Sequence, residues 1–133
     1  MRFDMAWFEG LRAALARDAL YSRIAGHFRA RLLFEDAGWA VLTRLDDGRL
    51  VEVQAPPPLM APWDVAIRGD ASAWEDLLAA VPPPRCQSVF ALAKAGRMRV
   101  EGDWLVLMQN LWAFTRLLEL MRAHDGDAGR AAA

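Results

Sequence analysis

The sequence predicts an α+β protein with a five-stranded, mostly antiparallel sheet and helices packed on one face. Two patterns carry this prediction. Short segments in which apolar and charged residues alternate, the period of a half-buried strand, follow one another in the middle of the chain. Segments at both ends repeat apolar residues every three or four positions, the period of an amphipathic helix. Strands grouped apart from helices are typical of the α+β class.

The composition is that of one ordinary globular domain. The chain has 133 residues, of which 55% are hydrophobic and 25% charged, enough for a single core. A net charge of -1 gives no general attraction to nucleic acid. The single Cys86 excludes an internal disulfide framework, and no run of 18 apolar residues predicts a membrane span. Charges throughout the N-terminal segment argue against a secretory signal, so we expect a cytoplasmic protein.

The first third of the chain predicts two helices and then a meander. Apolar residues at helical spacing follow Asp4, a suitable N-cap, and continue to about residue 18. A second short helix is expected from Tyr21 to Phe28. Alternating segments at 30–35, 39–43 and 51–54 then predict three strands, joined by a turn at 36–38 and by the hairpin signal Asp47-Gly48. The strands are predicted to turn these residues toward the core: Ala30, Leu32, Phe34, Trp39, Val41, Thr43, Val51 and Val53.

The middle of the chain predicts an irregular loop, a strand and two helices. Residues 55–62 contain four of the seven prolines and must be irregular and exposed. A fourth strand is expected at 63–68. The spacing Ser72-x-x-Glu75 is that of a capping box and predicts a helix from Ala73 to Val81, ended by Pro82–Pro84. A shorter helix is expected at 87–94.

The last third predicts a fifth strand and one long helix. Alternation at 97–101 predicts that Met98 and Val100 are buried and that Arg97 and Arg99 are exposed. After the break at 102–103, a helix is expected over 104–121. One stripe of this helix suits a core, with the members Trp104, Leu107, Leu111, Phe114, Leu118 and Met121. A second arc, formed by Leu105, Met108 and Trp112, needs another apolar neighbour. The domain is therefore predicted to span 1–123, and residues 124–133 to form a flexible tail.

Residue patterns for catalysis or metal binding are weak. His27 and His124 lie far apart, and no His/Cys cluster has metal-ligand spacing. Cys86 stands beside Arg85 without a nearby His, which favours an inert thiol over a nucleophile. A hairpin turn explains the adjacent Asp46 and Asp47. For an enzyme acting on a bound lipid, only the poor candidates Asp103, Gln109 and Asn110 offer polar groups. We therefore expect no enzyme, no metal and no cofactor.

The segment from Trp63 to Phe114 resembles the second half of the sterol carrier protein type 2 domain, the nonspecific lipid-transfer family. The resemblance rests on the strand 64–67 (DVAI), on Trp74 followed by Leu77-Leu78, and on the run 96–103 (GRMRVEGD) before an apolar helix. The N-terminal half is similar only in element order and in its hairpin. Two segments depart from the family pattern. Pro82–Pro84 replace a Gly-containing turn, and residues 92–94 stand where an aromatic residue and a Met are common.

This resemblance implies an apolar cavity, a tunnel between sheet and helices that the final helix closes at one end. The alternative from the residues alone is that the same side chains form an ordinary core. Six Trp and six Met in the chain suit a wide, adaptable apolar surface. The lipid-binding residues that the resemblance implies are Val65, Ile67, Trp74, Leu77, Phe90, Met98, Val100, Leu107, Met108, Leu111 and Trp112.

The expected function is that of a carrier that sequesters a fatty acid, acyl-CoA, sterol or isoprenoid lipid, with no nucleic-acid partner. Transient membrane contact and a monomer or weak homodimer fit this expectation. Arg85, Arg97 and Arg99 could form a basic rim for a lipid head group or CoA phosphates, although a solvated strand face explains them better. The loop 55–62 and the final helix are candidate lids. The alternative is a non-catalytic accessory subunit of a lipid or quinone biosynthesis complex that uses the same apolar groove.

Overall fold

The structure, a computed structural model, describes residues 3–132 and contains one five-stranded sheet. The strand order is β3-β2-β1-β4-β5. Neighbouring strands are antiparallel except β1 and β4, which run parallel. The predicted α+β class and the mostly antiparallel sheet are confirmed. The strands are β1 (Ala30–Glu35), β2 (Ala40–Asp46), β3 (Arg49–Gln54), β4 (Val65–Gly69) and β5 (Met98–Gly102).

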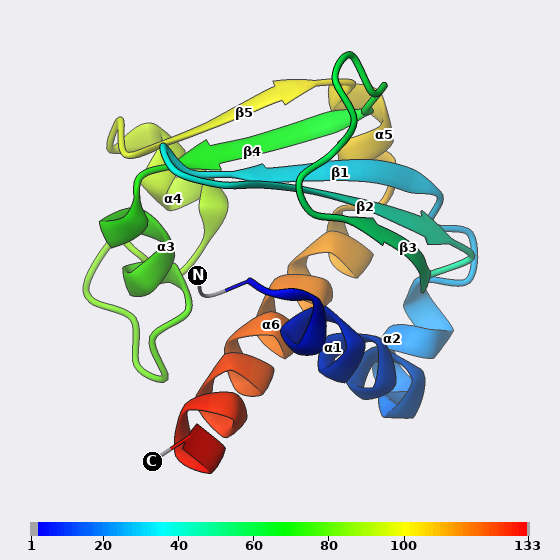
Figure 1. The fold of residues 1–133 in the computed structure, drawn as a ribbon, viewed down its shortest axis with the longest axis horizontal. Helices are drawn as coiled ribbons and strands as arrows, with labels where there is room; N and C mark the ends of the chain where they lie inside the picture. Colours follow the sequence, from blue (N-terminus) through cyan, green and yellow to red (C-terminus); the bar gives the residue numbers. More distant parts are fainter. Residues whose placement is uncertain (1–2, 133) are drawn as a thin grey trace.

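The helices pack on one face of this sheet, and α6 runs beneath it beside α1 (Figure 1). Asp4, Asp18, Asp70, Ser88 and Asp103 each accept a hydrogen bond from a backbone N–H of the first turn that follows them. The helices are α1 (Met5–Arg17), α2 (Ala19–Ile24), α3 (Ala71–Leu77), α4 (Val89–Lys94), α5 (Trp104–Gln109) and α6 (Leu111–Ala132). Among the residues described, no helix is both long and apolar enough to span a membrane.

Aromatic rings fill the space between the sheet and helices α1 and α3. Phe3 lies 4.6 Å from Trp7, 4.8 Å from Trp39 and 5.6 Å from Trp74, measured between ring centroids. The indole N–H of Trp74 donates to the carbonyl of Glu35 at 3.0 Å, which satisfies its one polar atom. This end of the interior is therefore occupied by side chains.

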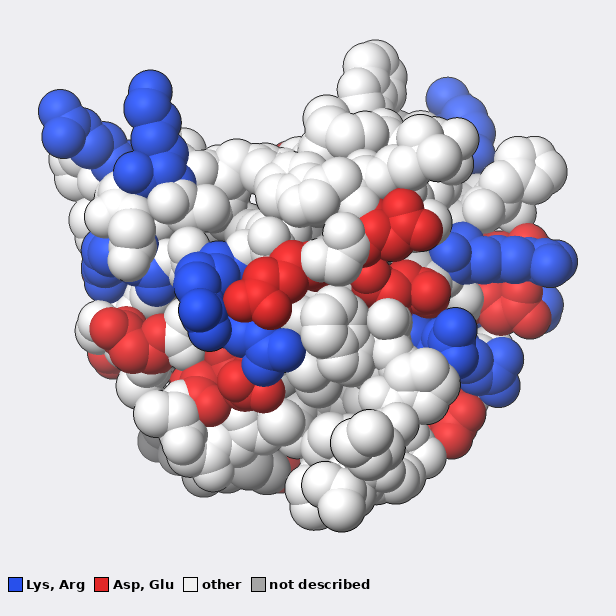
Figure 2. Space-filling view, turned by 90° about the horizontal axis from the view of Figure 1, so that it is seen from above, with Lys and Arg blue, Asp and Glu red and all other residues white. Residues whose placement is uncertain are grey.

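The outer face of the sheet carries charges in pairs. Arg68 lies between Glu35 at 2.7 Å and Glu101 at 3.4 Å, and Arg44 lies 3.3 Å from Glu52. Seen from above, basic and acidic residues lie next to one another across this face (Figure 2). Because each charge has an opposite neighbour, the face presents no large field of one sign. A small second core under the proline-rich loop is formed by Leu33, Leu42 and Ala66 with Ala40, Ala61 and Trp63.

A β-bulge explains why the prediction for Val51 is wrong. Leu45 pairs with Leu50 while its neighbour Arg44 pairs with Glu52, so Val51 is an extra residue in β3. Leu50 is buried in its place, and Val51 is exposed. The alternation resumes at Val53, which packs against the main core. A periodic pattern carries no signal for the inserted residue.

The bounds of helices α2 and α3 differ from the prediction. Helix α2 ends at Ile24 because the Ala25 N–H bonds to Tyr21 and the Phe28 N–H bonds back to Ala25, closing a turn before β1. Helix α3 starts at Ala71, and its cap is Asp70 instead of a Ser72 capping box. The Asp70 carboxylate accepts from the Ala73 N–H and from the Ser72 hydroxyl, both at 2.8 Å. The helix ends at Leu77, four residues earlier than expected.

The long helix predicted over 104–121 is two helices that meet at Asn110. The Asn110 side-chain amide donates to the Val106 carbonyl at 2.9 Å, and its backbone N–H bonds to Leu107, which ends α5. The described residues among those expected to form a flexible tail are helical in the structure, since α6 continues to Ala132. His124 and Asp125 hold it against α1. The His124 ring lies 2.8 Å from the Trp7 carbonyl, and the Trp7 indole donates to Asp125 at 3.2 Å.

Candidate functional site

The predicted lipid-binding residues fall into three groups in the structure. Six of them belong to the main core and are almost fully enclosed by other side chains: Val65, Ile67, Trp74, Leu77, Met98 and Leu107. Phe90, Val100 and Leu111 are half-buried, so the predicted burial of Val100 is only partial. That these nine line a ligand tunnel stays a prediction.

The remaining two, Met108 and Trp112, do not fit an enclosed wall. Both are exposed, because the helix break at Asn110 leaves their arc without a neighbouring element. The predicted core position of Trp104 is also wrong, since its side chain is exposed. A cavity of about 80 Å³ does lie between α4 and α6, lined by Phe90, Phe114 and neighbours. Ligand pockets commonly have volumes of roughly 300–1,000 Å³. This cavity is much smaller and has room for only a few atoms.

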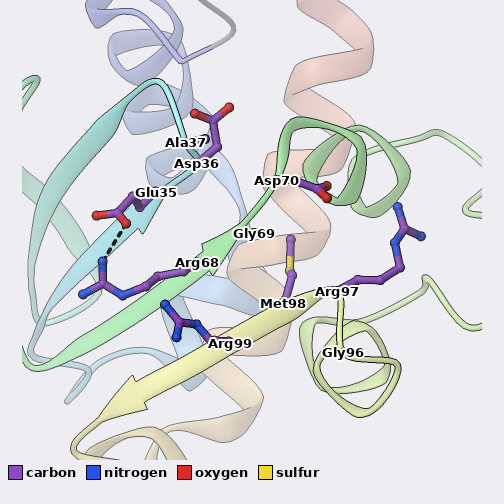
Figure 3. A pocket seen from close by; sticks show the side chains of 10 residues that line it. All are labelled: Glu35, Asp36, Ala37, Arg68, Gly69, Asp70, Gly96, Arg97, Met98 and Arg99. Carbon is purple, nitrogen blue, oxygen red and sulfur yellow. Dashed lines mark ion pairs between the residues drawn. The ribbon is translucent and has the colours of Figure 1, made fainter.

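A polar cleft of about 320 Å³ lies where β4 ends and β5 begins (Figure 3). A basic rim is the less favoured interpretation of the arginines in this region. Arg97 and Arg99 do line the cleft, together with Arg68, but so do three carboxylates, Glu35, Asp36 and Asp70. Arg97 turns out to be half-buried and pairs with Asp76 at 2.8 Å. Hydrogen bonds from the Ala73 N–H and the Ser72 hydroxyl lower the pKa of Asp70. The cleft therefore balances its charges internally.

Cys86 and the two histidines lie in separate environments. Cys86 is buried as a free thiol, with an Arg97 guanidinium nitrogen 3.4 Å from its sulfur. His27 is exposed next to the hairpin, whereas His124 packs on Trp7 with ring centroids 4.9 Å apart. Among the described residues, no group of three or more His, Cys, Asp and Glu side chains could hold a metal ion.

A larger apolar pocket of about 540 Å³ lies between helices α1 and α2 and the β2–β3 hairpin. Apolar atoms make up most of its lining. None of the residues predicted to bind lipid takes part in it. The lining residues are Arg12, Leu15, Ala16, Tyr21, Ser22, Asp47, Gly48, Arg49, Leu50 and Val51.

The back of this pocket is fixed by the contact between α2 and the hairpin turn. The buried Tyr21 hydroxyl donates to the Gly48 carbonyl at 2.7 Å. Burial raises the pKa of the Tyr21 phenol, so the group stays neutral and keeps this hydrogen bond. Gly48 has φ +80° and approaches so closely that an added Cβ would lie 2.7 Å from the Ala25 carbonyl oxygen. Only glycine fits this position without strain.

The mouth of the pocket carries the charges. Arg12 donates from Nε to the Leu50 carbonyl at 2.7 Å and ties α1 to β3, while its other end pairs with Glu9 at 2.8 Å. Arg49 is exposed beside it. The one acidic lining residue, Asp47, accepts a hydrogen bond from Arg29, which lowers the pKa of Asp47. Because Arg12 and Asp47 are both already paired, the exposed Arg49 is the charge at the mouth that could meet an anionic group.

The sequence did not reveal this pocket, because its patterns place Leu15 and Tyr21 only on helices and assign Leu50 no role. Their neighbours carried a weak signal. Arg12 and Ala16, four apart on α1, put a long polar and a very small side chain beside the apolar stripe. Such a notch in a helix face leaves space when the opposite strand bulges, as β3 does.

Comparisons with known proteins identify the fold. No family model and no curated protein matches the sequence. Among solved structures, sterol carrier protein 2 is similar at 20% identity with a TM-score of 0.71, over 88% of this chain and 94% of that chain. A conserved hypothetical protein of Thermus thermophilus, described as a possible sterol carrier protein, is similar at 20% identity, TM-score 0.72, over 92% and 88%. A ubiquinone synthesis protein, UbiJ-SCP2, is similar at 21% identity, TM-score 0.58, over 84% of both chains. The chain therefore has the fold of sterol carrier protein 2, as its motifs between Trp63 and Phe114 predicted.

Proposed function

We propose that this protein is a non-enzymatic carrier of single-chain anionic lipids, which it holds in the pocket between α1, α2 and the β2–β3 hairpin. The observation that carries the proposal is the size and apolar lining of this pocket, about 540 Å³. That volume lies within the range of roughly 300–1,000 Å³ seen for small-molecule sites. The likeness to sterol carrier protein 2 supports a carrier of an apolar ligand.

The energetics favour a long alkyl chain with modest affinity. Each buried methylene contributes about 0.8 kcal/mol, so ten or eleven of them contribute roughly 8–9 kcal/mol. Association costs on the order of 4 kcal/mol or more. The difference of about 4–5 kcal/mol corresponds to a Kd of roughly 0.2–1 mM. An apolar wall with no directional polar group distinguishes poorly between chains, which suits a carrier.

The mouth favours a carboxylate or phosphate head group. Arg12 is paired with Glu9 and Asp47 with Arg29, so the guanidinium group of Arg49, which has no ion pair among the described residues, is the one left for an anionic head group. A fatty acid would place its chain along Leu15 and Leu50 and its carboxylate toward Arg49. A sterol, which has no anionic group, would gain nothing from this mouth.

Isothermal titration calorimetry with dodecanoate below its micellar concentration tests the proposal. We expect saturable one-to-one binding by the wild-type chain. Ala16→Phe enlarges an exposed residue of α1 that lines the pocket, so it should weaken binding at least about tenfold without unfolding the protein.

Ala13→Phe is the matched control, because Ala13 is exposed on the same helix but does not line the pocket. It should leave the Kd within about twofold, since surface substitutions are close to neutral. Absence of any saturable heat in the wild type, or equal weakening by the two variants, would contradict the pocket as the lipid site.

A second candidate, a non-catalytic accessory subunit, is supported by the likeness to the ubiquinone synthesis protein. The apolar face of α5 would then contact another protein. This candidate predicts no saturable dodecanoate binding in the same titration. The two functions therefore differ in the first experiment.

A further inference from the structure

Four large apolar side chains project into solvent from α5 and the first turn of α6. Their exposed fractions are 47% for Trp104, 66% for Leu105, 45% for Met108 and 78% for Trp112. We call these four residues the α5 patch. Residues 104–115 contain no charged side chain. Large contiguous apolar patches on a folded chain usually mark an interaction site.

The fold holds the α5 patch outward. Asp103 caps α5 through hydrogen bonds from the Leu105 and Val106 N–H groups at 3.1 and 3.2 Å, and its own N–H bonds to the Asp64 carbonyl at 2.7 Å. The inner residue of α5, Leu107, is buried. With one side of so short a helix fixed in the core, the opposite side must face solvent. The α5 patch is therefore a built feature of the fold, next to the end of β5 (Figure 1).

The size of the α5 patch argues against a second copy of the chain as its partner. Aromatic side chains bury about 150–250 Å² each, so two half-exposed Trp with one Leu and one Met offer on the order of 400–500 Å². A stable protein interface needs about 800 Å² from each partner.

The chemistry of the α5 patch fits the surface of a lipid bilayer. Trp side chains are enriched at membrane interfaces, where the ring meets the acyl chains and the indole N–H meets the head groups. A basic residue stands nearby. Phe90 packs against Trp104 with ring centroids 6.3 Å apart, and Lys94 lies one helical turn after Phe90 and is exposed. Lys94 thus adds a positive charge at the margin of the α5 patch.

We propose that the α5 patch docks the protein on lipid bilayers, with a preference for anionic ones. The surface is separate from the pocket between α1, α2 and the hairpin, and no ligand is needed there for docking. Trp112 and Leu105 would enter the head-group layer, while Lys94 faces the phosphates. Docking would bring a carrier to the membrane from which it loads or unloads.

Flotation with vesicles tests the proposal on the full chain. The probes are phosphatidylcholine vesicles with and without about one quarter phosphatidylglycerol, because anionic lipid adds roughly fivefold in affinity per basic residue at the surface. The wild type should float, more strongly with phosphatidylglycerol. The double variant L105Q/W112Q should lose at least about tenfold in partitioning. Lys94→Gln should lose only the preference for phosphatidylglycerol.

The control is the double variant M5Q/V81Q, which removes two exposed apolar side chains from α1 and from the loop after α3. It should bind vesicles within about twofold of wild type. A thermal melt shows whether each variant is folded, and Trp112→Gln alone replaces the double variant should that one unfold. The proposal is overturned if the wild type stays with neither vesicle, or if L105Q/W112Q and M5Q/V81Q behave alike. A dimer that only L105Q/W112Q disrupts, without vesicle binding, would assign the α5 patch to a second copy.

Discussion

At the scale of single residues, Asp18 joins helices α2 and α6. It accepts a hydrogen bond from the Tyr21 N–H at 2.8 Å and so caps α2. It also receives two hydrogen bonds from Arg116 of α6, at 2.7 and 3.0 Å. The hydrogen bonds from Arg116 and from Tyr21 lower the pKa of Asp18. This residue thereby positions α2, whose Tyr21 forms the back of the proposed lipid pocket.

The lowered pKa makes a pH prediction. Because the folded-state pKa of Asp18 lies below its unfolded value near 3.8, its contribution to stability is present above that value and is lost as the pH falls through the folded pKa. Asp18→Asn keeps a capping oxygen but removes the charge. We expect it to lower the free energy of unfolding at pH 7 by about 1–2 kcal/mol. Urea unfolding at pH 7, 4 and 2.5 should show the gap between wild type and variant closing in acid. A gap that stays constant would exclude this role.

At the scale of elements, the C-terminal part of α6 is anchored to α1. Gly10 permits the approach, since a Cβ there would collide with the His124 ring. The anchor consists of the His124 contact with the Trp7 carbonyl and the hydrogen bond from Trp7 to Asp125. The pairing brings together segments more than a hundred positions apart, so it also fixes the helix that carries Arg12 and Ala16.

Truncation after Ala123 tests this anchor. It removes two hydrogen bonds and one ring contact and should lower the free energy of unfolding by about 2–3 kcal/mol. Urea denaturation measures the change. A chain ending at Gly129 keeps His124, Asp125 and Ala128 and should unfold within about 0.5 kcal/mol of wild type. Equal stability of the two truncated chains would mean that the segment after Ala123 is a frayed tail, as its small polar composition indicates.

The elements themselves were largely predictable, because alternation and helical spacing report directly which side of a segment is buried. The strand at 97–101 and its neighbour at 63–68 were both expected close to their bounds. The wrong predictions arise where local hydrogen bonding departs from the regular pattern. Asn110 ends α5 through a bond to Val106 that leaves the apolar period intact, so one helix was expected where there are two. The bulge at Val51 likewise breaks pairing with β2 without any change in composition.

At the scale of the whole molecule, the pocket was beyond the reach of the sequence. Its walls come from α1, α2 and the hairpin, and its size depends on how closely Gly48 and Tyr21 approach each other. Family resemblance directed attention to the space under β4, β5 and α6, where six of the predicted lipid-binding residues belong to the main core and a tunnel stays a prediction. The fold could be inferred from half of the chain. Where it leaves room for a ligand depends on side-chain packing across distant segments.

The central claim is that the ligand occupies this pocket, and an amide NMR titration locates it most directly. In ¹⁵N-labelled full-length chain titrated with dodecanoate, we predict saturating shifts that are largest at Tyr21, Gly48 and Leu50. Residues around Phe90 and Phe114 should change little. Saturating shifts centred on Phe90 and Phe114 would place the lipid between α4 and α6 and contradict the account, and so would a titration that moves no amide.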